Sequence, residues 1–218
     1  MIRVSNGLNV IQKLVPSEKY GVKCPYKMNP TCYVVHNTAN DATARSEINY
    51  MISNDNLTSF HYAIDDIEIV QGVTEDRNTF HAGDGANGKG NRQGIGIEIC
   101  YSKSGGERFI KAERLAAKFI ACKLIERGWG IEKVTKHQDY SGKYCPHRTL
   151  DMGWQRFLDM IKKEMEDNIM SNDNMTLDEA LKVLKANGLI SNTEPWKTTI
   201  ETGKHMETLI LNVAQKLK

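Results

Sequence analysis

The sequence has no long hydrophobic run. Its apolar stretches extend over only a few residues, whereas a helix that spans a bilayer needs about 20 of them. The N-terminus also lacks the succession of basic, apolar and small residues that is typical of a secretory signal. We therefore expect a protein that is made in the cytoplasm and does not insert into a membrane.

Charge of one sign is scarce as well. The chain carries 29 Lys and Arg against 27 Asp and Glu, so its formal net charge is only +2. A dedicated nucleic-acid binder normally concentrates a basic excess, so this balance argues against a nucleic-acid partner. The five cysteines are odd in number and widely spread, which argues against a disulfide scaffold and leaves at least one for another role.

Signals for strands and helices alternate over residues 1–165. Apolar or alternating runs predict strands at 32–36, 60–65, 67–73, 94–101 and 134–137. Amphipathic spacing predicts helices at 42–52, 111–127 and 154–165, with Asp41 as a candidate N-cap of the first and Gly128 ending the second. Strands that alternate with covering helices predict an α/β sheet domain.

Three side chains with metal-binding atoms follow predicted strands. His36 ends an apolar strand, and His137 ends the short strand predicted at 134–137. Cys145 comes eight residues after His137, beyond a Gly-containing loop. Two imidazoles and a thiolate are suitable Zn²⁺ ligands, and three protein ligands leave a fourth position for water, as in catalytic sites. The spacing alone leaves ordinary alternatives open, namely a hydrogen-bonded histidine at a strand end and a packed cysteine before Pro146.

Five motifs together resemble a known family: VVHNTAN, SFHYAID, TFHAGDGANGKGN, IGIEICYS and KHQDYSGKYCPHR. The chain is similar to the type-2 N-acetylmuramoyl-L-alanine amidases, zinc enzymes related to peptidoglycan recognition proteins and used as endolysins by phages of bacilli and clostridia. The resemblance covers about residues 1–165 and implies a central mixed β-sheet flanked by helices. It also implies that His36, His137 and Cys145 are the zinc ligands.

The resemblance implies an endolysin. Such an enzyme hydrolyses the amide bond between N-acetylmuramic acid and L-alanine of bacterial peptidoglycan with zinc-activated water, and acts at the cell wall after release through a holin-type pore. Family members that only bind cell wall have lost the thiolate at the position of Cys145, so its presence favours catalysis. The alternatives are a host autolysin or germination amidase of the same chemistry, and a non-catalytic peptidoglycan-binding module.

Glu98 and Lys143 are the candidate catalytic residues. Amide hydrolysis needs a base for the attacking water and an acid for the leaving amine. Glu98 lies between Ile97 and Ile99 on a predicted strand, where burial would raise its pKa, and it matches the catalytic glutamate of the resembling family. Its alternative is a solvent-facing strand residue. Lys143 stands two residues before Cys145, so an extended loop would direct both to one cleft, where the cation stabilises an oxyanion.

Other polar residues are candidates for substrate contacts. His81 and His61 lie in motifs of the resembling family, and we expect His81 to line the substrate groove. His61 is either a groove residue or a buried, hydrogen-bonded histidine. Asn37 and Thr38 follow a candidate ligand directly, so they are expected in contact with the substrate or with the ligands. The Gly-rich residues 83–94 lack the ending of a phosphate-binding loop and are expected to line the groove without opening a helix.

The C-terminal part differs in composition. Residues 166–175 are polar and rich in Asn and Asp, which predicts a linker. Residues 176–218 show two amphipathic stripes, so we expect a small helical C-terminal module. So few residues rarely bury enough core to fold alone, and we expect the module to bind cell wall or to form a homo-oligomer. The alternative is a helical extension packed on the catalytic domain.

The linker also suggests a second translation product. The peptide of residues 165–170 can be encoded by a string that contains GGAGG shortly before the Met170 codon, which is a ribosome-binding sequence in low-GC Gram-positive bacteria. We hypothesise a short chain that starts at Met170 or Met175 and assembles with the full-length chain through the stripe at 206–217. The alternative is that these codons are a coincidence.

Overall fold

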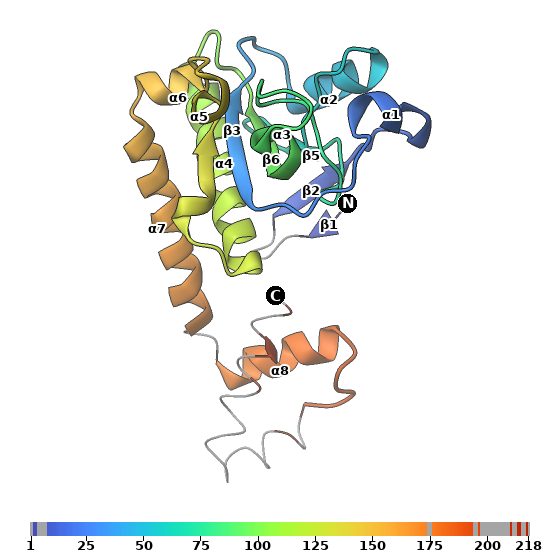
Figure 1. Cartoon of the computed structure of the whole chain (residues 1–218). Coiled ribbons are helices and arrows are strands. Elements are labelled where there is room, and N and C mark those ends of the chain that lie inside the picture. The colour runs from blue at the N-terminus through green and yellow to red at the C-terminus, as the bar shows by residue number, and fades with distance from the viewer. Residues whose placement is uncertain are drawn as a thin grey trace. The chain divides into compact units, whose positions relative to one another are not determined.

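The computed structural model describes residues 2–3, 8–173, 176–193, 196, 210, 213–214 and 217. The chain divides into two compact units, Met1–Glu164 and Met165–Lys218. The first unit holds a sheet with helices on both faces, and the second holds helix α8 (Figure 1).

The sheet of the first unit has seven strands in the order β1-β2-β5-β4-β6-β3-β7. β3 pairs in parallel with β6 and β7, β6 pairs in parallel with β4, and β2 pairs in parallel with β5. The pairs β1/β2 and β4/β5 are antiparallel, so the sheet is mixed, as predicted. The strands are β1 Ile2–Arg3, β2 Asn9–Gln12, β3 Cys32–Asn37, β4 Tyr62–Ile64, β5 Ile69–Gln71, β6 Gly94–Ile99 and β7 Val134–Lys136.

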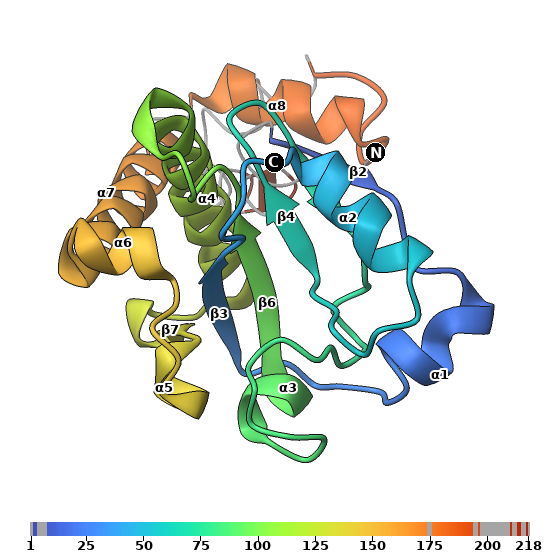
Figure 2. The same ribbon diagram turned by 90° about the horizontal axis from the view of Figure 1, so that it is seen from above.

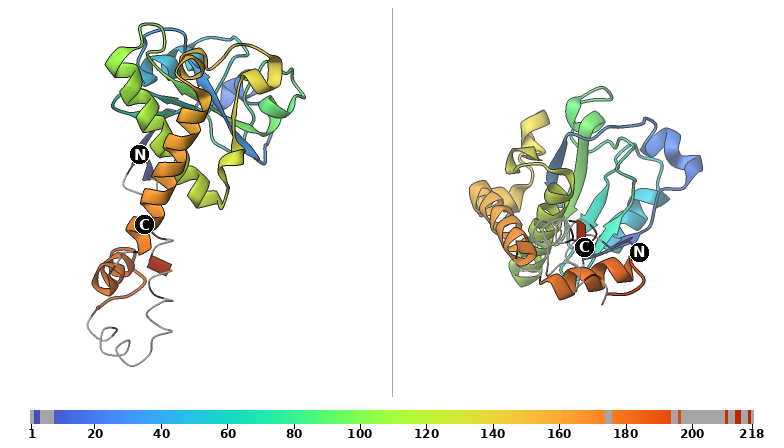
Figure 3. Two further views of the ribbon diagram at one scale, coloured as in Figure 1. Left: turned by 90° about the vertical axis from the view of Figure 1, so that its left-hand side faces the viewer. Right: turned by 90° about the horizontal axis from the view of Figure 1, so that it is seen from below.

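Helices cover both faces of this sheet. Figure 2 shows α2 on one face and α4 on the other, with α7 beyond α4, and Figure 3 shows α4 and α7 running side by side. The helices are α1 Tyr20–Lys23, α2 Ala44–Ser53, α3 Lys89–Gln93, α4 Gly106–Arg127, α5 Gln138–Ser141, α6 His147–Asp151 and α7 Trp154–Asp173, with 3₁₀ turns at Ser17–Lys19 and Ile131–Lys133.

The central strands are buried because helices cover them from both sides. All six residues of β3 are buried, and β6 exposes only part of Glu98. On α4, aromatic and aliphatic side chains including Phe109, Phe119 and Ile120 are fully buried. The helix ends where Gly128 takes a left-handed backbone conformation with φ 63°, as its sequence predicts.

Helix α2 begins two residues later than expected. Its N-cap is Thr43, whose hydroxyl accepts a hydrogen bond from the backbone N–H of Ser46. The expected cap, Asp41, instead accepts hydrogen bonds from the backbone and side chain of Ser104. Asp and Thr both cap helices well. Asp41 is not the cap because its carboxylate is hydrogen-bonded to Ser104, which is distant in the chain.

The second unit begins inside a helix. Residues 166–173, expected as an irregular linker, continue α7 as far as Asp173. Extending a helix is easier than nucleating one, which explains why this segment continues α7 despite its Asn and Asp residues.

Helix α8 (Leu177–Ala186) confirms the first helix predicted for this unit, and Thr176 and Glu179 form a capping box at its start. Ala180, Leu181 and Leu184 pack into a small apolar cluster with Ile210 and Ala214. The second predicted helix, over 206–217, lies mostly outside the described residues. None of the helices in the described part of the chain has the length and apolar character that crossing a membrane requires.

Candidate metal centre and active-site cleft

Three neighbouring parallel strands, β6, β3 and β7, end at the same edge of the sheet. His36 of β3 is in register with Glu98 of β6, so the two side chains project from the same face. Val35 pairs with Lys136 of β7, and the N–H of His137 donates to the carbonyl of Val35. The register therefore brings Glu98, His36 and His137 together, although 101 residues separate the two histidines.

Cys145 completes the cluster from the loop after α5. The Nδ1 atoms of His36 and His137 are 3.0 Å apart, and Cys145 Sγ lies 3.9 Å from His36 Nδ1. One ligand atom from each of the three residues lies within 4.8 Å of the others, and all three residues are buried. The structure thus brings together the three residues that the sequence predicts as metal ligands.

Burial affects the protonation of this cluster. It lowers the pKa of His36 well below 6.5, and the neighbouring His81, His137 and Lys143 lower it further. The pKa of His137 is also lowered, by burial and then by Lys143. Both rings are therefore neutral near pH 7, which is the form that binds a metal. Burial and the nearby Glu98 raise the pKa of the Cys145 thiol to about 11. A bound cation would favour the thiolate and so oppose this shift.

Glu98 lies beside the candidate ligands. Its Oε1 atom is 4.0 Å from His36 Nδ1, whereas its Oε2 atom is buried without a hydrogen-bond partner among the described residues. Burial, together with the negative charge of Glu47, raises the pKa of Glu98 to about 8, and Lys143 opposes the shift. An unpartnered buried carboxylate oxygen is costly, so its presence points to a ligand or a reaction.

A cleft of about 670 Å³ opens above the cluster. His36, His137, Cys145 and Glu98 line it, and so does the exposed Lys143, as predicted from its position two residues before Cys145. The remainder of the described lining is rich in amide and hydroxyl groups from α2 and its flanking loops. These residues include Thr38, Asn40, Ser46, Glu47, Tyr50, Asn54, Asn56 and Thr58.

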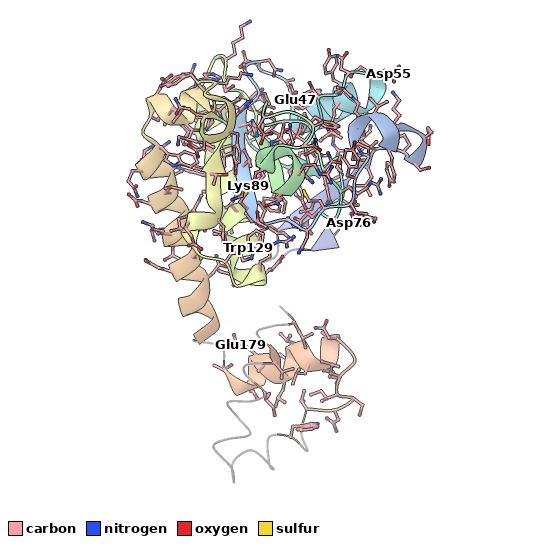
Figure 4. All side chains as sticks on the ribbon, viewed as in Figure 1. Glu47, Asp55, Asp76, Lys89, Trp129 and Glu179 are labelled. Atoms are coloured by element: carbon pink, nitrogen blue, oxygen red, sulfur yellow. The ribbon has the colours of Figure 1, made fainter. Side chains whose placement is uncertain are left out.

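The polar face of α2 is the part of this wall that the sequence analysis did not identify. Ser46, Glu47 and Tyr50 follow one another at helical spacing, a signal that was available in the sequence. Glu47, labelled in Figure 4, accepts a hydrogen bond of 2.6 Å from the side chain of Asn40, and burial raises its pKa. The cleft thus contains a second carboxylate besides Glu98.

The four residues predicted to contact substrate take different places. Thr38 lines the cleft, and its hydroxyl is buried without a partner among the described residues. Asn37 also borders the cleft, but its amide is engaged: the oxygen accepts the N–H groups of Arg148 and Thr149 at the start of α6. Its amide nitrogen donates to His36 O and Thr149 Oγ1. Asn37 therefore holds α6 in place.

His61 is not brought to the cleft. It is fully buried, its Nε2 donates to the carbonyl of Arg77, and its Nδ1 accepts from the N–H of Gly96 and from Thr79 Oγ1. It is the buried, hydrogen-bonded histidine of the two alternatives. His81 borders the cleft, but its ring nitrogens contact His36 and Gly94.

The Gly-rich segment also differs from expectation. The described lining of the cleft includes none of residues 83–94, and Lys89–Gln93 form the short helix α3. The carboxylate of Asp84 accepts the N–H groups of Gly90 and Asn91 and thereby caps this turn. A side-chain cap inside a segment without apolar periodicity explains why the sequence analysis missed the helix.

The fold and the cluster define the class of the protein. It is an α/β protein whose parallel strands carry a candidate metal centre, two histidines and a cysteine, at the base of a polar cleft beside a carboxylate.

Known proteins resemble this chain in sequence and fold. Residues 26–148 match the family described as N-acetylmuramoyl-L-alanine amidase. The chain is 54% identical over 160 residues to N-acetylmuramoyl-L-alanine amidase CwlA of Bacillus subtilis (strain 168), which covers 73% of this chain and 59% of CwlA. It is 54% identical over 161 residues to N-acetylmuramoyl-L-alanine amidase XlyB of the same organism, covering 73% and 51%. The structure of PlyL aligns with a TM-score of 0.69 and 49% identity over 71% of this chain and 97% of PlyL.

The chain therefore belongs to the N-acetylmuramoyl-L-alanine amidase family, which confirms the resemblance seen in its motifs. The matched residues lie within the first compact unit. The chain spans 59% and 51% of the lengths of the two curated relatives named above.

Proposed function

We propose that the protein is an N-acetylmuramoyl-L-alanine amidase that hydrolyses the bond between N-acetylmuramic acid and L-alanine in bacterial peptidoglycan. The observation that carries the proposal is the position of Glu98 beside the His36–His137–Cys145 cluster at the base of an open cleft. Its buried Oε2 atom has no hydrogen-bond partner among the described residues. A non-catalytic wall-binding protein would need neither a three-ligand cluster nor a free carboxylate beside it.

Zn²⁺ is the ion we propose for the cluster. Zinc–nitrogen bonds of about 2.0–2.1 Å and a zinc–sulfur bond of about 2.3 Å, arranged tetrahedrally, place two nitrogens about 3.3 Å apart and a nitrogen and a sulfur about 3.6 Å apart. The corresponding separations here are 3.0 Å for His36 and His137 and 3.9 Å for His36 and Cys145. A donor set of two imidazoles and a thiolate suits zinc better than the oxygen-seeking Mg²⁺ or Ca²⁺.

The residues of the cleft have separate roles in this proposal. Zinc, when bound, supplies Lewis-acid polarisation and lowers the pKa of Glu98 through its positive charge. Glu98 takes the proton of the attacking water and returns it to the leaving amine. Lys143 stabilises the negative charge that develops on the amide oxygen. Thr38 and the polar face of α2 orient the substrate.

The test is mass spectrometry of purified peptidoglycan digested with and without a chelator. We expect new L-alanine amino termini from the untreated enzyme, loss of this product with the chelator, and its return when zinc is added. Cleavage at another bond, or cleavage that the chelator leaves unchanged, would overturn the proposal.

We further propose that the C-terminal module, residues 176–218, attaches the enzyme to the cell wall or associates with copies of itself. The small apolar cluster around α8 supports a module with its own packing, and Trp196 is 39% exposed and available to a partner. An enzyme with this substrate acts outside the membrane, so release of the cytoplasmic protein through a holin-type pore is part of the proposal.

A short product that begins at Met170 or Met175 belongs to the same proposal. It would carry the C-terminal module alone and would raise the avidity of the assembly for the wall. Met170 lies within α7, and Met175 lies outside the described residues. Expression from the native gene followed by intact-mass analysis should show two species, the shorter of which disappears in Met170→Ile if Met170 is the start. A single species at 24.6 kDa would rule this product out.

A further inference from the structure

The ring of His81 contacts the ring of His36. His36 Nε2 lies 2.8 Å from His81 Nδ1, and the rings meet edge to face with their centroids 4.9 Å apart. The other nitrogen of His81, Nε2, lies 3.2 Å from the carbonyl oxygen of Gly94. Both nitrogens of His81 are therefore engaged, one with a backbone carbonyl and one with a candidate metal ligand.

These contacts determine which nitrogens carry protons. A carbonyl oxygen can only accept a hydrogen bond, so Nε2 of the neutral His81 ring carries the proton. His81 Nδ1 is then an acceptor, and His36 Nε2 must donate to it. The remaining nitrogen of His36, Nδ1, has no proton, and this is the atom that faces His137 and Cys145.

The chain around His81 holds the ring in this orientation. Asn91 Oδ1 accepts the backbone N–H of His81 at 2.7 Å, and Asp84 in turn accepts the backbone N–H of Asn91 at 3.2 Å. Gly96 leaves room for the ring, because a Cβ atom at that position would lie 2.8 Å from His81 Cγ. A side chain at position 96 would therefore displace His81.

We propose that His81 is a positioning residue for the metal ligand His36. By accepting the Nε2 proton of His36, it selects the tautomer whose Nδ1 can bind an ion and fixes the direction of that nitrogen. The proposal rests on the proposed function for the role of His36 as a ligand. Partners of this kind usually contribute 10–100-fold, roughly, to metal affinity.

Two variants of similar shape separate hydrogen bonding from packing. His81→Asn places an amide oxygen near the position of Nδ1 and keeps the acceptor, whereas His81→Leu fills the same space without one. We expect zinc affinity, measured on the full chain by competition with a chromophoric chelator, to fall roughly 10–100-fold in His81→Leu and to stay within about threefold of wild type in His81→Asn. Equal affinity in all three proteins, or equal loss in both variants, would overturn the proposal.

A second measurement needs no variant. Histidine ¹⁵N shifts of the metal-free wild-type chain report the tautomer of each ring, and we expect His36 to carry its proton on Nε2. A proton on Nδ1 would overturn the proposal even if the variants failed to fold. Failure of the proposed function would look different, since a wild-type chain that binds no zinc could still show the Nε2–H tautomer.

Discussion

Two buried histidine groups lie in the first unit, and they differ in how completely their polar atoms are hydrogen-bonded. Around His61, both ring nitrogens have partners, and the hydroxyl of Thr79 and the N–H of Gly96 are used in the same network. Around His36, by contrast, Nδ1 atoms of two rings face each other and a thiol, and Glu98 keeps a buried oxygen without a partner among the described residues.

The difference shows which group stabilises the fold and which is prepared for a ligand. A satisfied buried network repays the cost of removing polar groups from water, so it needs nothing from outside the protein. An unsatisfied one carries that cost until an ion or a substrate supplies the missing partner. Variants in the two groups should therefore fail in different ways, one in stability and the other in binding or turnover.

Removal of a proposed zinc ligand should have the largest effect. We expect Cys145→Ser to abolish hydrolysis and to reduce zinc content, because a hydroxyl is a far poorer zinc ligand than a thiolate. Metal analysis and the peptidoglycan assay measure both. Cys32→Ser is the matched control, since that buried thiol contacts the hydroxyl of Tyr140 at 3.3 Å, and it should keep its zinc. Full occupancy and turnover in Cys145→Ser would remove this residue from the site.

Replacement of the proposed base, Glu98, should have the next largest effect. Glu98→Gln keeps the size of the side chain but cannot accept a proton, so we expect the rate to fall by roughly 10²–10⁴-fold. Zinc content and unfolding temperature should stay near those of wild type, which separates a catalytic defect from a damaged fold. Near-normal hydrolysis would place the base elsewhere.

Acid should lower the stability of the fold through His61, whose group is fully hydrogen-bonded. Burial lowers the pKa of His61 from 6.5 to about 4, so the unfolded chain takes up this proton first as the pH falls. The free energy of unfolding then decreases between pH 6.5 and 4, by up to about 3 kcal/mol from this residue. Denaturant titrations of metal-free protein should show a smaller decrease in His61→Gln. The same pH dependence in both proteins would show that His61 is not held neutral.

The smallest effects come from single hydroxyls, and they provide the most direct comparison. Thr38→Val removes a hydroxyl that has no partner in the described structure, so we expect unchanged stability and a KM raised by roughly 2–10-fold, the contribution of one neutral hydrogen bond. Thr79→Val removes a partner of His61 and should lower the free energy of unfolding by about 1–3 kcal/mol without changing KM. Reversed results would exchange the roles of the two groups.

Local pattern was sufficient for much of the first unit. The apolar run before His36 predicted strand β3, and Gly128 predicted the end of helix α4; the structure contains both. The chemistry of His36, His137 and Cys145 made them candidate ligands, the family resemblance favoured that role, and the structure brings the three residues together. The cap of α2, the α3 turn and the helical residues 166–173 were missed, because each depends on a contact or on helix propagation that local pattern does not show.

Sequence by itself determined the periodic elements and the residue types able to bind a metal or move a proton, because hydrophobic period and side-chain chemistry are local properties. It could not decide whether His61 lines the groove or is buried and hydrogen-bonded. Only the parallel register of β6, β3 and β7 places Glu98 and His137 beside His36, and only the packing of His81 on Gly96 directs a ring nitrogen to His36. Whether a buried polar atom finds a partner depends on residues distant in the chain, so the tertiary structure decided which histidine is structural and which serves the site.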